Sequence, residues 1–477
     1  MPLLLAARGA KSAWRAAALG WVAGAAFFAL LLHWIYLTCR FAGVPVPVSL
    51  LAWAALAAFE GAAWAVFAAG VYRLARLPAA LRPWACAALW TALEFALARW
   101  TPRVGCDLLG YTQWRFLTLL QPASWFGPHA LGFLIVATNG VLACSLSPKG
   151  ERGGVRESVV LLRNAVVVVV LIAAWWLAGT ISFRTAPTPH PNPGVILPQG
   201  GREYLVAIIQ PNVDQYRKWD ESEVVSIRST FDRLLAQAAQ AKPALIVWPE
   251  TSVPGWLEDN RIWVSSWAAR SGVAQLAGAL TGQDGFHRNS AVLVDASGRI
   301  AGVYHKRELV PFGEYVPFRR YLERWIGILG QMGDLTPGAL KQPPLETPIG
   351  PVGVTLCYEA IFPRWSRLNV QAGARVLANL TNDGWYKDTW GPLQHFYANR
   401  FRAIENRAYV IRAGNTGISA VIDPWGRVTA RLDLMKEGVL YGSVPSVDPF
   451  PRRSLYSRAG DWFGWLALIA AIAALVI

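Results

Sequence analysis

The feature that most restricts how this chain can fold is a series of long apolar segments, which fill its N-terminal part and return at its C-terminal end. Five segments are predicted first and a sixth closes the chain: 16–37, 49–72, 84–99, 129–147, 160–181 and WFGWLALIAAIAALVI at 462–477. A helix needs about 20 predominantly apolar residues to cross the hydrocarbon core of a bilayer. With 54% hydrophobic residues and a mean hydropathy of +0.30, the chain is also too apolar for an ordinary soluble enzyme. We therefore predict that these segments are transmembrane helices.

The distribution of Lys and Arg predicts the orientation of these helices, because positive residues resist translocation across a membrane. Three basic clusters precede the first segment or lie in alternate connections: Arg8, Lys11, Arg15; Arg73, Arg76, Arg82; and Lys149, Arg152, Arg156. The other connections carry fewer positive residues, although Arg99, Arg103 and Arg115 reduce the contrast. The clusters are predicted to be cytoplasmic, so the region after the fifth segment faces outward. The net charge of +15 then reflects membrane topology and attraction to anionic lipids, not nucleic-acid binding.

The pattern changes between about residues 204 and 450, where short apolar runs alternate with helical patterns. Runs such as YLVAIIQP, ALIVWPE and RVLANLTND resemble strands, whereas 222–240 and 391–407 carry apolar residues at helical spacing. VDASGRIAGVYHK and IDPWGRVTARLD each predict a hairpin turn. The region is therefore predicted to be an α/β domain with buried sheets covered by helices.

The predicted boundaries are 1–183 for a membrane domain of about five spans, 184–203 for a Pro- and Gly-rich linker, 204–450 for the globular domain and 451–477 for a C-terminal return and last transmembrane helix.

Three side chains of different chemistry follow predicted strands in this domain: Glu250, Lys306 and Cys357. Taken singly, a free cysteine is more often a buried small residue, and the two charges are more often ordinary surface or turn residues. Taken together, they supply a base, a cation and a thiol, which are the groups that a catalytic cysteine requires. Cys357 is also the only thiol in this domain, because Cys39, Cys86, Cys106 and Cys144 lie in the membrane domain. The three groups could meet at one sheet edge.

The motifs around these residues resemble the nitrilase superfamily. WPET contains Glu250, HKRELVPFGEYVP contains Lys306 and Glu314, and CYE contains Cys357. Nearly the whole chain resembles the apolipoprotein N-acyltransferases, since GYTQ, QPNVDQYRKW, LTNDGW, QHFYANRFRAIENRAYVIRAGNTGISAVIDPWG and YSRAGDW also match that family's pattern. The resemblance implies a multi-pass α-helical membrane domain followed by an α/β, nitrilase-like αββα sandwich.

The resemblance also implies a role for each matching residue. It implies Glu250 as general base, Lys306 as stabiliser of an oxyanion and Cys357 as nucleophile. Glu314 is expected to orient Lys306 and to share in proton transfer. The backbone N–H of Tyr358 is expected to complete the oxyanion hole.

Four further residues are of interest with less defined roles. Glu359 stands beside the nucleophile, and Trp219 in RKW matches a family position that is implicated in activity. An interfacial anchor is an equal alternative for Trp219. Glu60 and Glu94 lie in predicted spans, where an ionisable side chain is costly, and we expect them to pair or hydrogen-bond inside the helix bundle.

The reaction that the resemblance implies is transfer of an acyl chain from a phospholipid to the N-terminal α-amine of the diacylglyceryl-cysteine of an apolipoprotein, through a thioester on Cys357. The implied location is the bacterial inner membrane, with the catalytic domain in the periplasm. No cofactor or metal is expected, because no P-loop, dinucleotide fingerprint or metal-spaced cluster is found. His287, His305 and His395 are interpreted as hydrogen-bonding or surface residues. The alternatives are a membrane-tethered carbon-nitrogen hydrolase (amidase or nitrilase) and a non-catalytic membrane scaffold or transporter.

The sequence departs from the family pattern in two places. The spans that the family carries nearest its start are not seen, so the chain either starts late or is a shorter member. Gly105 and Cys106 stand where Pro and Trp are expected.

Overall fold

The computed structural model describes residues 1–100, 108–146, 155–187, 203–215, 217–283, 285–322, 334–445 and 453–477. The chain divides into two compact units, Met1–Ala186 with Ala459–Ile477 and Pro187–Arg458. Most of the predicted linker 184–203 lies outside the described residues, as do Gly105 and Cys106.

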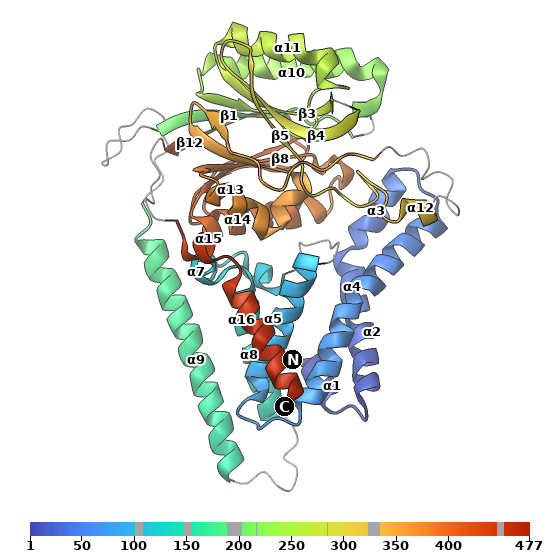
Figure 1. Cartoon of the computed structure of the whole chain (residues 1–477), viewed down its shortest axis with the longest axis vertical. Helices are drawn as coiled ribbons and strands as arrows, with labels where there is room; N and C mark the ends of the chain where they lie inside the picture. The colour runs from blue at the N-terminus through green and yellow to red at the C-terminus, as the bar shows by residue number, and fades with distance from the viewer. Residues whose placement is uncertain are drawn as a thin grey trace. The chain divides into compact units, whose positions relative to one another are not determined.

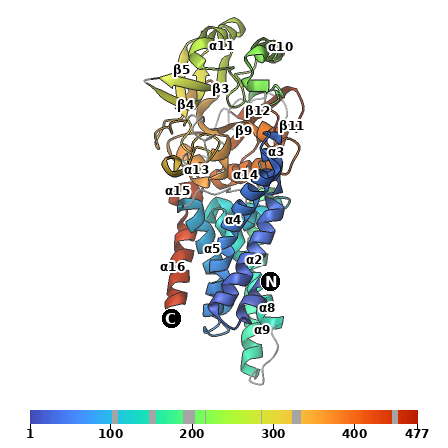
Figure 2. The ribbon, with the colours of Figure 1, turned by 90° about the vertical axis from the view of Figure 1, so that its right-hand side faces the viewer.

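The first unit consists of helices, coloured blue, cyan, green and, at the C-terminus, red in Figures 1 and 2. They are α1 (Pro2–Arg8), α2 (Ala13–Leu31), α3 (His33–Phe41), α4 (Val46–Leu74), α5 (Arg82–Trp100), the short α6 (Leu117–Leu120) and α7 (Ala123–Phe126), α8 (His129–Leu146), α9 (Val155–Arg184) and α16 (Trp462–Val476). Among the described residues, four helices are long and apolar enough to cross a membrane, namely α2, α4, α8 and the Ser158–Arg184 part of α9. The chain is therefore a multi-pass membrane protein.

The other two predicted spans are helical but are not among the four helices that are long and apolar enough to cross a membrane. The segment 84–99 lies in α5, which is less apolar because it includes Arg82, Glu94 and Arg99, and the C-terminal segment forms α16 with 15 residues. The first predicted span, 16–37, is wrong as one helix, because α2 ends at Leu31 and the more polar segment from His33 forms α3.

Charged side chains inside this unit have polar neighbours. Glu94 is buried; its Oε1 accepts a hydrogen bond from Leu109 N at 2.8 Å and its Oε2 lies 3.8 Å from His129 Nδ1. This is the expected contact inside the bundle. Glu60 is also buried.

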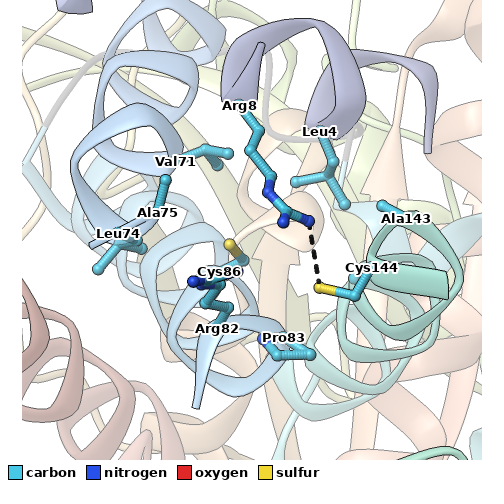
Figure 3. Close-up of a pocket in the computed structure, with 11 residues that line it drawn as sticks. Leu4, Arg8, Val71, Leu74, Ala75, Arg82, Pro83, Cys86, Ala143 and Cys144 are labelled. Atoms are coloured by element: carbon cyan, nitrogen blue, oxygen red, sulfur yellow. Dashed lines mark hydrogen bonds between the residues drawn. The ribbon is translucent and has the colours of Figure 1, made fainter. Parts of the chain in front are cut away.

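Figure 3 shows a small cavity in this unit, lined by residues from the ends of α1, α4 and α8 and from the start of α5. Arg8 Nη1 lies 3.7 Å from Cys144 Sγ, and Arg82 and Cys86 line the same cavity. Arg8 and Arg82 belong to two of the predicted basic clusters. These two clusters therefore contribute to one end of the bundle, as expected if two membrane-spanning helices separate them along the chain.

Glycines allow α2 and α4 to pack closely. A Cβ added to Gly20 would lie 2.3 Å from the Trp64 carbonyl oxygen, and one added to Gly61 would lie 2.6 Å from Ala25 N. Small residues permit this close approach of backbones, which is how membrane helices gain contact without a hydrophobic driving force between them.

The second unit contains two six-stranded sheets. The first has the order β12-β1-β2-β3-β4-β5 and the second the order β11-β10-β9-β8-β7-β6. The strands of the first are β1 (Glu203–Gln210), β2 (Leu245–Val247), β3 (Ala274–Gln283), β4 (Phe286–Val294), β5 (Ile300–His305) and β12 (Gly438–Pro445). Those of the second are β6 (Leu345–Thr347), β7 (Gly350–Leu356), β8 (Val376–Thr381), β9 (Tyr409–Gly414), β10 (Ser419–Ile422) and β11 (Val428–Leu432).

The helices of this unit lie mainly on the outer faces of the two sheets. α10 (Val224–Gln240) and α11 (Leu257–Ser271) cover the first sheet, and α13 (Pro363–Gln371) and α14 (Gly391–Asn406) cover the second (Figure 1). The short α12 (Arg319–Leu322) and α15 (Leu455–Ala459) lie in connecting segments. The predicted αββα sandwich is confirmed.

Successive side chains of a strand point to opposite faces of the sheet, which explains these layers. Val206 and Ile208 of β1 belong to the core between the two sheets, whereas Ala207 and Ile209 belong to the core under α10 and α11. A strand that is buried on both faces reads as a continuous apolar run, and YLVAIIQ has this form.

Strand direction gathers the polar side chains at one edge. β1, β2 and β3 run parallel, β4 reverses direction, and β5 reverses it again. β7, β8 and β9 run parallel in the second sheet. Glu250 therefore follows β2, Lys306 follows β5, and Cys357 and Asp383 follow β7 and β8.

A substitution between α2 and α4 tests the packing of the membrane unit. Replacing Gly61 by Leu forces the helices apart, and overpacking of this kind costs about 1–3 kcal/mol. The Gly61→Leu protein should have a lower apparent thermal midpoint in detergent than the wild type. Ala62→Leu, at the exposed neighbouring position, is the control and should leave the midpoint unchanged. Equal midpoints for both variants would contradict the close packing of α2 on α4.

Candidate active site

The centre of the site is the ammonium group of Lys306, which is held between two carboxylates. Lys306 Nζ lies 3.0 Å from Glu250 Oε1 and 2.9 Å from Glu314 Oε1, and its side chain is 1% exposed. Burial alone would lower the pKa of Lys306, but Glu250 and Glu314 outweigh it and raise the pKa well above its ordinary value. Lys306 is therefore a permanent cation.

The two carboxylates are fixed by further donors. Asn289 Nδ2, on β4, donates to Glu250 Oε1 and to Glu314 Oε1, at 2.8 Å in each case. Asn382 N donates to Glu250 Oε2 at 3.0 Å, and Val310 N donates to Glu314 Oε2 at 2.9 Å. Glu250 and Glu314 thus have their second oxygens on backbone amides and share Lys306 and Asn289 through their first.

The backbone of β3 lets Glu250 approach this position. A Cβ added to Gly278 would lie 2.3 Å from the Pro249 carbonyl oxygen and 2.6 Å from Glu250 Cα. Only glycine leaves room for the Glu250 segment there. The Gly278 carbonyl also accepts a hydrogen bond from Ser252 N at 2.7 Å, which fixes the segment against β3.

Cys357 lies at a sharp turn between β7 and the 3₁₀ helix Cys357–Ile361. Its φ of 46° places a residue other than glycine in the left-handed region, where strain is common at functional sites. Burial raises the pKa of the thiol to about 12, and the nearby Glu250 carboxylate adds to this effect while Lys306 opposes it. The resting thiol is therefore protonated, so a base must remove the proton before the sulfur can react.

A polar network fixes the backbone at this turn. His395 Nε2 donates to the Cys357 carbonyl oxygen at 2.9 Å, and His395 Nδ1 lies 2.9 Å from Asp383 Oδ1. Arg412 Nη2 donates to Asp383 Oδ2 at 2.6 Å. Burial would raise the pKa of Asp383, but Arg412 and His395 hold it at about 2. His395 was interpreted as a hydrogen-bonding or surface residue, and it is buried and hydrogen-bonded.

The same network bears on metal binding. Cys357 Sγ, a carboxylate oxygen of Asp383 and a ring nitrogen of His395 lie within 4.8 Å of one another, which is spacing that could hold a metal ion. Both ring nitrogens of His395 are already in hydrogen bonds, and Asp383 is paired with Arg412. We therefore interpret Asp383 and His395 as support for the Cys357 turn.

Glu359 joins the segments that carry the lysine and the cysteine. Its Oε1 accepts hydrogen bonds from Arg307 N at 2.5 Å and from Glu308 N at 3.1 Å. Its Oε2 accepts from Leu356 N and from Tyr304 Oη, at 2.7 Å in each case. Burial raises the pKa of this carboxyl group. Since its donors flank Lys306 and precede Cys357, Glu359 sets the spacing between those two residues.

The structure places the remaining predicted residues as follows. The Tyr358 ring is half-buried and packs edge-on against Phe362, with centroids 4.9 Å apart. Trp219 lies in the 3₁₀ helix Arg217–Trp219, and its side chain is outside the described part of the structure. His305 Nδ1 lies 2.8 Å from Ser290 Oγ, and His287 is exposed beside Trp256.

Sequence reasoning missed several polar residues of the site: Asn289, Asp383, Arg412 and Lys218. Asp383 and Lys218 stand inside motifs that resemble the family, LTNDGW and QPNVDQYRKW, which was the available signal. Asn289 and Arg412 lie inside apolar strand patterns, where a single polar residue does not reveal its partner.

Comparison with known proteins identifies the family. Residues 205–449 match the carbon-nitrogen hydrolase family, and residues 1–141 match the apolipoprotein N-acyltransferase N-terminal domain. The apolipoprotein N-acyltransferase of Geobacter metallireducens is 35% identical over 99% of this chain and 89% of its own length. That of Brucella melitensis biotype 1 is 32% identical over 97% of this chain and 86% of its own.

The chain belongs to the apolipoprotein N-acyltransferase family. Both parts of the family's architecture, an N-terminal membrane domain and a carbon-nitrogen hydrolase domain, are present in one chain. Among solved structures, a carbon-nitrogen hydrolase from Helicobacter pylori covers 51% of this chain and 89% of its own, with 20% identity and a TM-score of 0.40.

The position of Glu359 leads to a stability prediction. In Glu359→Gln the side-chain NH₂ group must face N–H or O–H groups whose hydrogen bonds the carboxylate accepts in the wild type. These donors would then lack an acceptor, and an unsatisfied buried donor costs about 1–3 kcal/mol. The variant should show a lower thermal midpoint and slower alkylation of Cys357 by iodoacetamide. Glu346→Gln, at an exposed position on β6, is the control. Wild-type values for Glu359→Gln would show that Glu359 does not set the geometry at Cys357.

Proposed function

We propose that this N-acyltransferase moves an acyl chain from a phospholipid to the N-terminal α-amine of the diacylglyceryl-cysteine of apolipoproteins, with Cys357 as nucleophile. The observation that carries the proposal is the buried Lys306, held by Glu250 and Glu314 beside a cysteine at a strained turn. This arrangement supplies a base, a fixed cation and a thiol together. The names of the relatives, apolipoprotein N-acyltransferases, support the choice of substrates.

The first step forms a thioester. Glu250 takes the proton of the Cys357 thiol, and the thiolate attacks an ester carbonyl carbon of the phospholipid. The oxyanion that forms faces the Lys306 ammonium, whose charge needs no rearrangement because Glu250 and Glu314 already hold it in place. The carbon–oxygen bond then breaks. The lysophospholipid leaves with the proton from Glu250.

The second step transfers the chain to nitrogen. The neutral α-amine of the acceptor attacks the thioester carbonyl carbon, and Glu250 accepts the amine proton. The carbon–sulfur bond breaks, an amide is formed, and Cys357 regains its proton from Glu250. The expected role of Glu314 is to hold Lys306 through both steps, and that of the Tyr358 N–H is to assist Lys306 at the oxyanion.

Lipid substrates require a site beside the bilayer. Withdrawing an acyl chain into water costs about 0.8 kcal/mol per methylene group, so both substrates remain anchored while they react. We propose that the segment that carries Phe312 and Phe318 contacts lipid. Support comes from Phe312 and Phe318, whose side chains are exposed, Phe318 by 79%. Aromatic rings that only covered the domain core would be less exposed.

The location is proposed from the same reasoning. Because positive residues resist translocation, we propose that the basic clusters face the cytoplasm and that the hydrolase-like unit faces the periplasm of a bacterial inner membrane. The gathering of Arg8 and Arg82 around one cavity supports a common side for two of these clusters.

A direct test is the intact mass of the purified protein after incubation with phospholipid. A mass increase of one acyl chain should appear, should map to Cys357 and should be removed by hydroxylamine, as expected for a thioester. Cys357→Ala should show no increase. Lys306→Met should form the adduct at least about a hundredfold more slowly, since removal of one oxyanion partner costs this much in other enzymes.

Lys341→Met, which removes an exposed lysine, is the matched control and should behave as the wild type. Product formation in Cys357→Ala would exclude the thioester route. Release of fatty acid by wild-type protein at the same rate with and without an acceptor amine would favour a hydrolase instead.

A further inference from the structure

A second buried lysine lies in this site. Lys218 belongs to the 3₁₀ helix Arg217–Trp219 and is 8% exposed. Its Nζ donates to the Glu250 carbonyl oxygen at 3.1 Å and to Thr251 Oγ1 at 2.5 Å. The ammonium thus contacts the main chain of the proposed base.

The contact stabilises an unfavourable backbone. Thr251 has a φ of 45°, and a β-branched residue in the left-handed region is a genuine outlier that surrounding contacts must maintain. Lys218 bonds both to the carbonyl that precedes Thr251 and to the Thr251 side chain. It therefore fixes the peptide group that follows the proposed base.

The segment that carries Lys218 is anchored to loops at the same sheet edge. Asn415 Oδ1 accepts from Val213 N at 3.0 Å, and Asn415 Nδ2 donates to the Val213 carbonyl oxygen at 2.8 Å. Gln215 is buried and its Oε1 accepts from Asn382 Nδ2, while Asn382 N donates to Glu250. The position of Lys218 is consequently linked to the residues that hold Glu250.

The two lysines contact different parts of Glu250. Lys306 donates to its carboxylate, and Lys218 donates to its carbonyl oxygen. Burial lowers the pKa of Lys218 to about 8, and the charges of Glu250 and of the Cys357 thiolate only partly oppose this effect. On its own segment, the charged neighbour Arg217 is paired with Glu223. Lys218 thus loses its charge as the pH rises through about 8, while Lys306 keeps its own.

We propose that Lys218 is a positioning residue of the acyl transfer, which fixes the Glu250–Thr251 peptide group and adds a second positive charge that favours the Cys357 thiolate. The inference deepens the proposed function and rests on it for the identity of the reaction. The Glu250 carboxylate opposes the formation of a thiolate at Cys357, and the Lys218 ammonium, which contacts the Glu250 carbonyl oxygen, offsets this effect.

The test measures alkylation of Cys357 by iodoacetamide from about pH 6.5 to 9.5, because the rate follows the thiolate fraction and needs no lipid. A neighbouring cation lowers a thiol pKa by about one unit or more, so wild-type protein should react at least about tenfold faster than Lys218→Met below pH 8. The ratio should fall towards one above pH 8, where the wild-type Lys218 is neutral. Arg217→Met, on the same helix, should match the wild type at every pH.

Two further variants separate charge from folding. Lys218→Arg keeps its charge at every pH, so its advantage over Lys218→Met should persist above pH 8. Lys218→Gln can donate hydrogen bonds without a charge, and it should react as slowly as Lys218→Met while retaining a wild-type thermal midpoint. Equal alkylation rates below pH 8 in the wild type and Lys218→Gln would overturn the proposal and leave Lys218 a structural residue.

The same samples distinguish this inference from the proposed function. If wild-type protein forms no acyl adduct with phospholipid, the acyl transfer is wrong, yet the alkylation profile still decides whether Lys218 acts on the thiol. If the adduct forms normally in Lys218→Met, and its alkylation profile is that of the wild type, the proposed function stands and the role of Lys218 is wrong.

Discussion

The rest of the site depends on one interaction, the buried ammonium of Lys306 between Glu250 and Glu314. Burying three charged groups is costly, and removal of one partner from such a cluster typically costs about 3–5 kcal/mol because a charge is left uncompensated. The cluster is tolerated only if each member is placed accurately. Asn289, which bonds to both carboxylates, and Glu359, which joins the Lys306 segment to the Cys357 segment, provide that accuracy.

The sandwich explains how distant parts of the chain reach this cluster. Its parallel strands, and the double reversal through β4 and β5, direct the ends of β2, β5, β7 and β8 to one edge. Burial there works against the nucleophile, since it raises the pKa of the Cys357 thiol to about 12. Neighbouring charged groups must therefore take over the role of solvent in stabilising charge. In the proposed chemistry, Glu250 accepts the thiol proton and Lys306 stabilises the oxyanion. Strain at Cys357 and Thr251 is consistent with a site that the surrounding fold holds in place.

The sequence predicted the parts of this architecture that depend on local pattern. Strands buried on both faces, such as β1 and β8, and the amphipathic α10 were predicted within a few residues, as were the hairpin turns at Asp295 and Asp423. The half-buried β12 was not predicted, because its pairing with β1 joins residues from opposite ends of the unit. Motif resemblance suggested the reactive residues, but Asn289 and Lys218 could not be assigned. Their significance lies in partners that only the fold brings near. The break after Leu31 was also missed, because apolar residues such as Trp34 and Ile35 continue past it among the more polar ones.

The most direct test of the central claim is to follow the acyl chain of an isolated acyl-enzyme. Wild-type protein would be acylated, freed of phospholipid, and mixed with a diacylglyceryl-cysteine peptide whose α-amine is free, with the N-acetylated peptide as control. The account predicts that the chain leaves Cys357 and appears as an amide on the free peptide, and that it stays on the enzyme when the amine is blocked. Loss of the chain to water at one rate with either peptide, or peptide acylation only when phospholipid is added back, would contradict it.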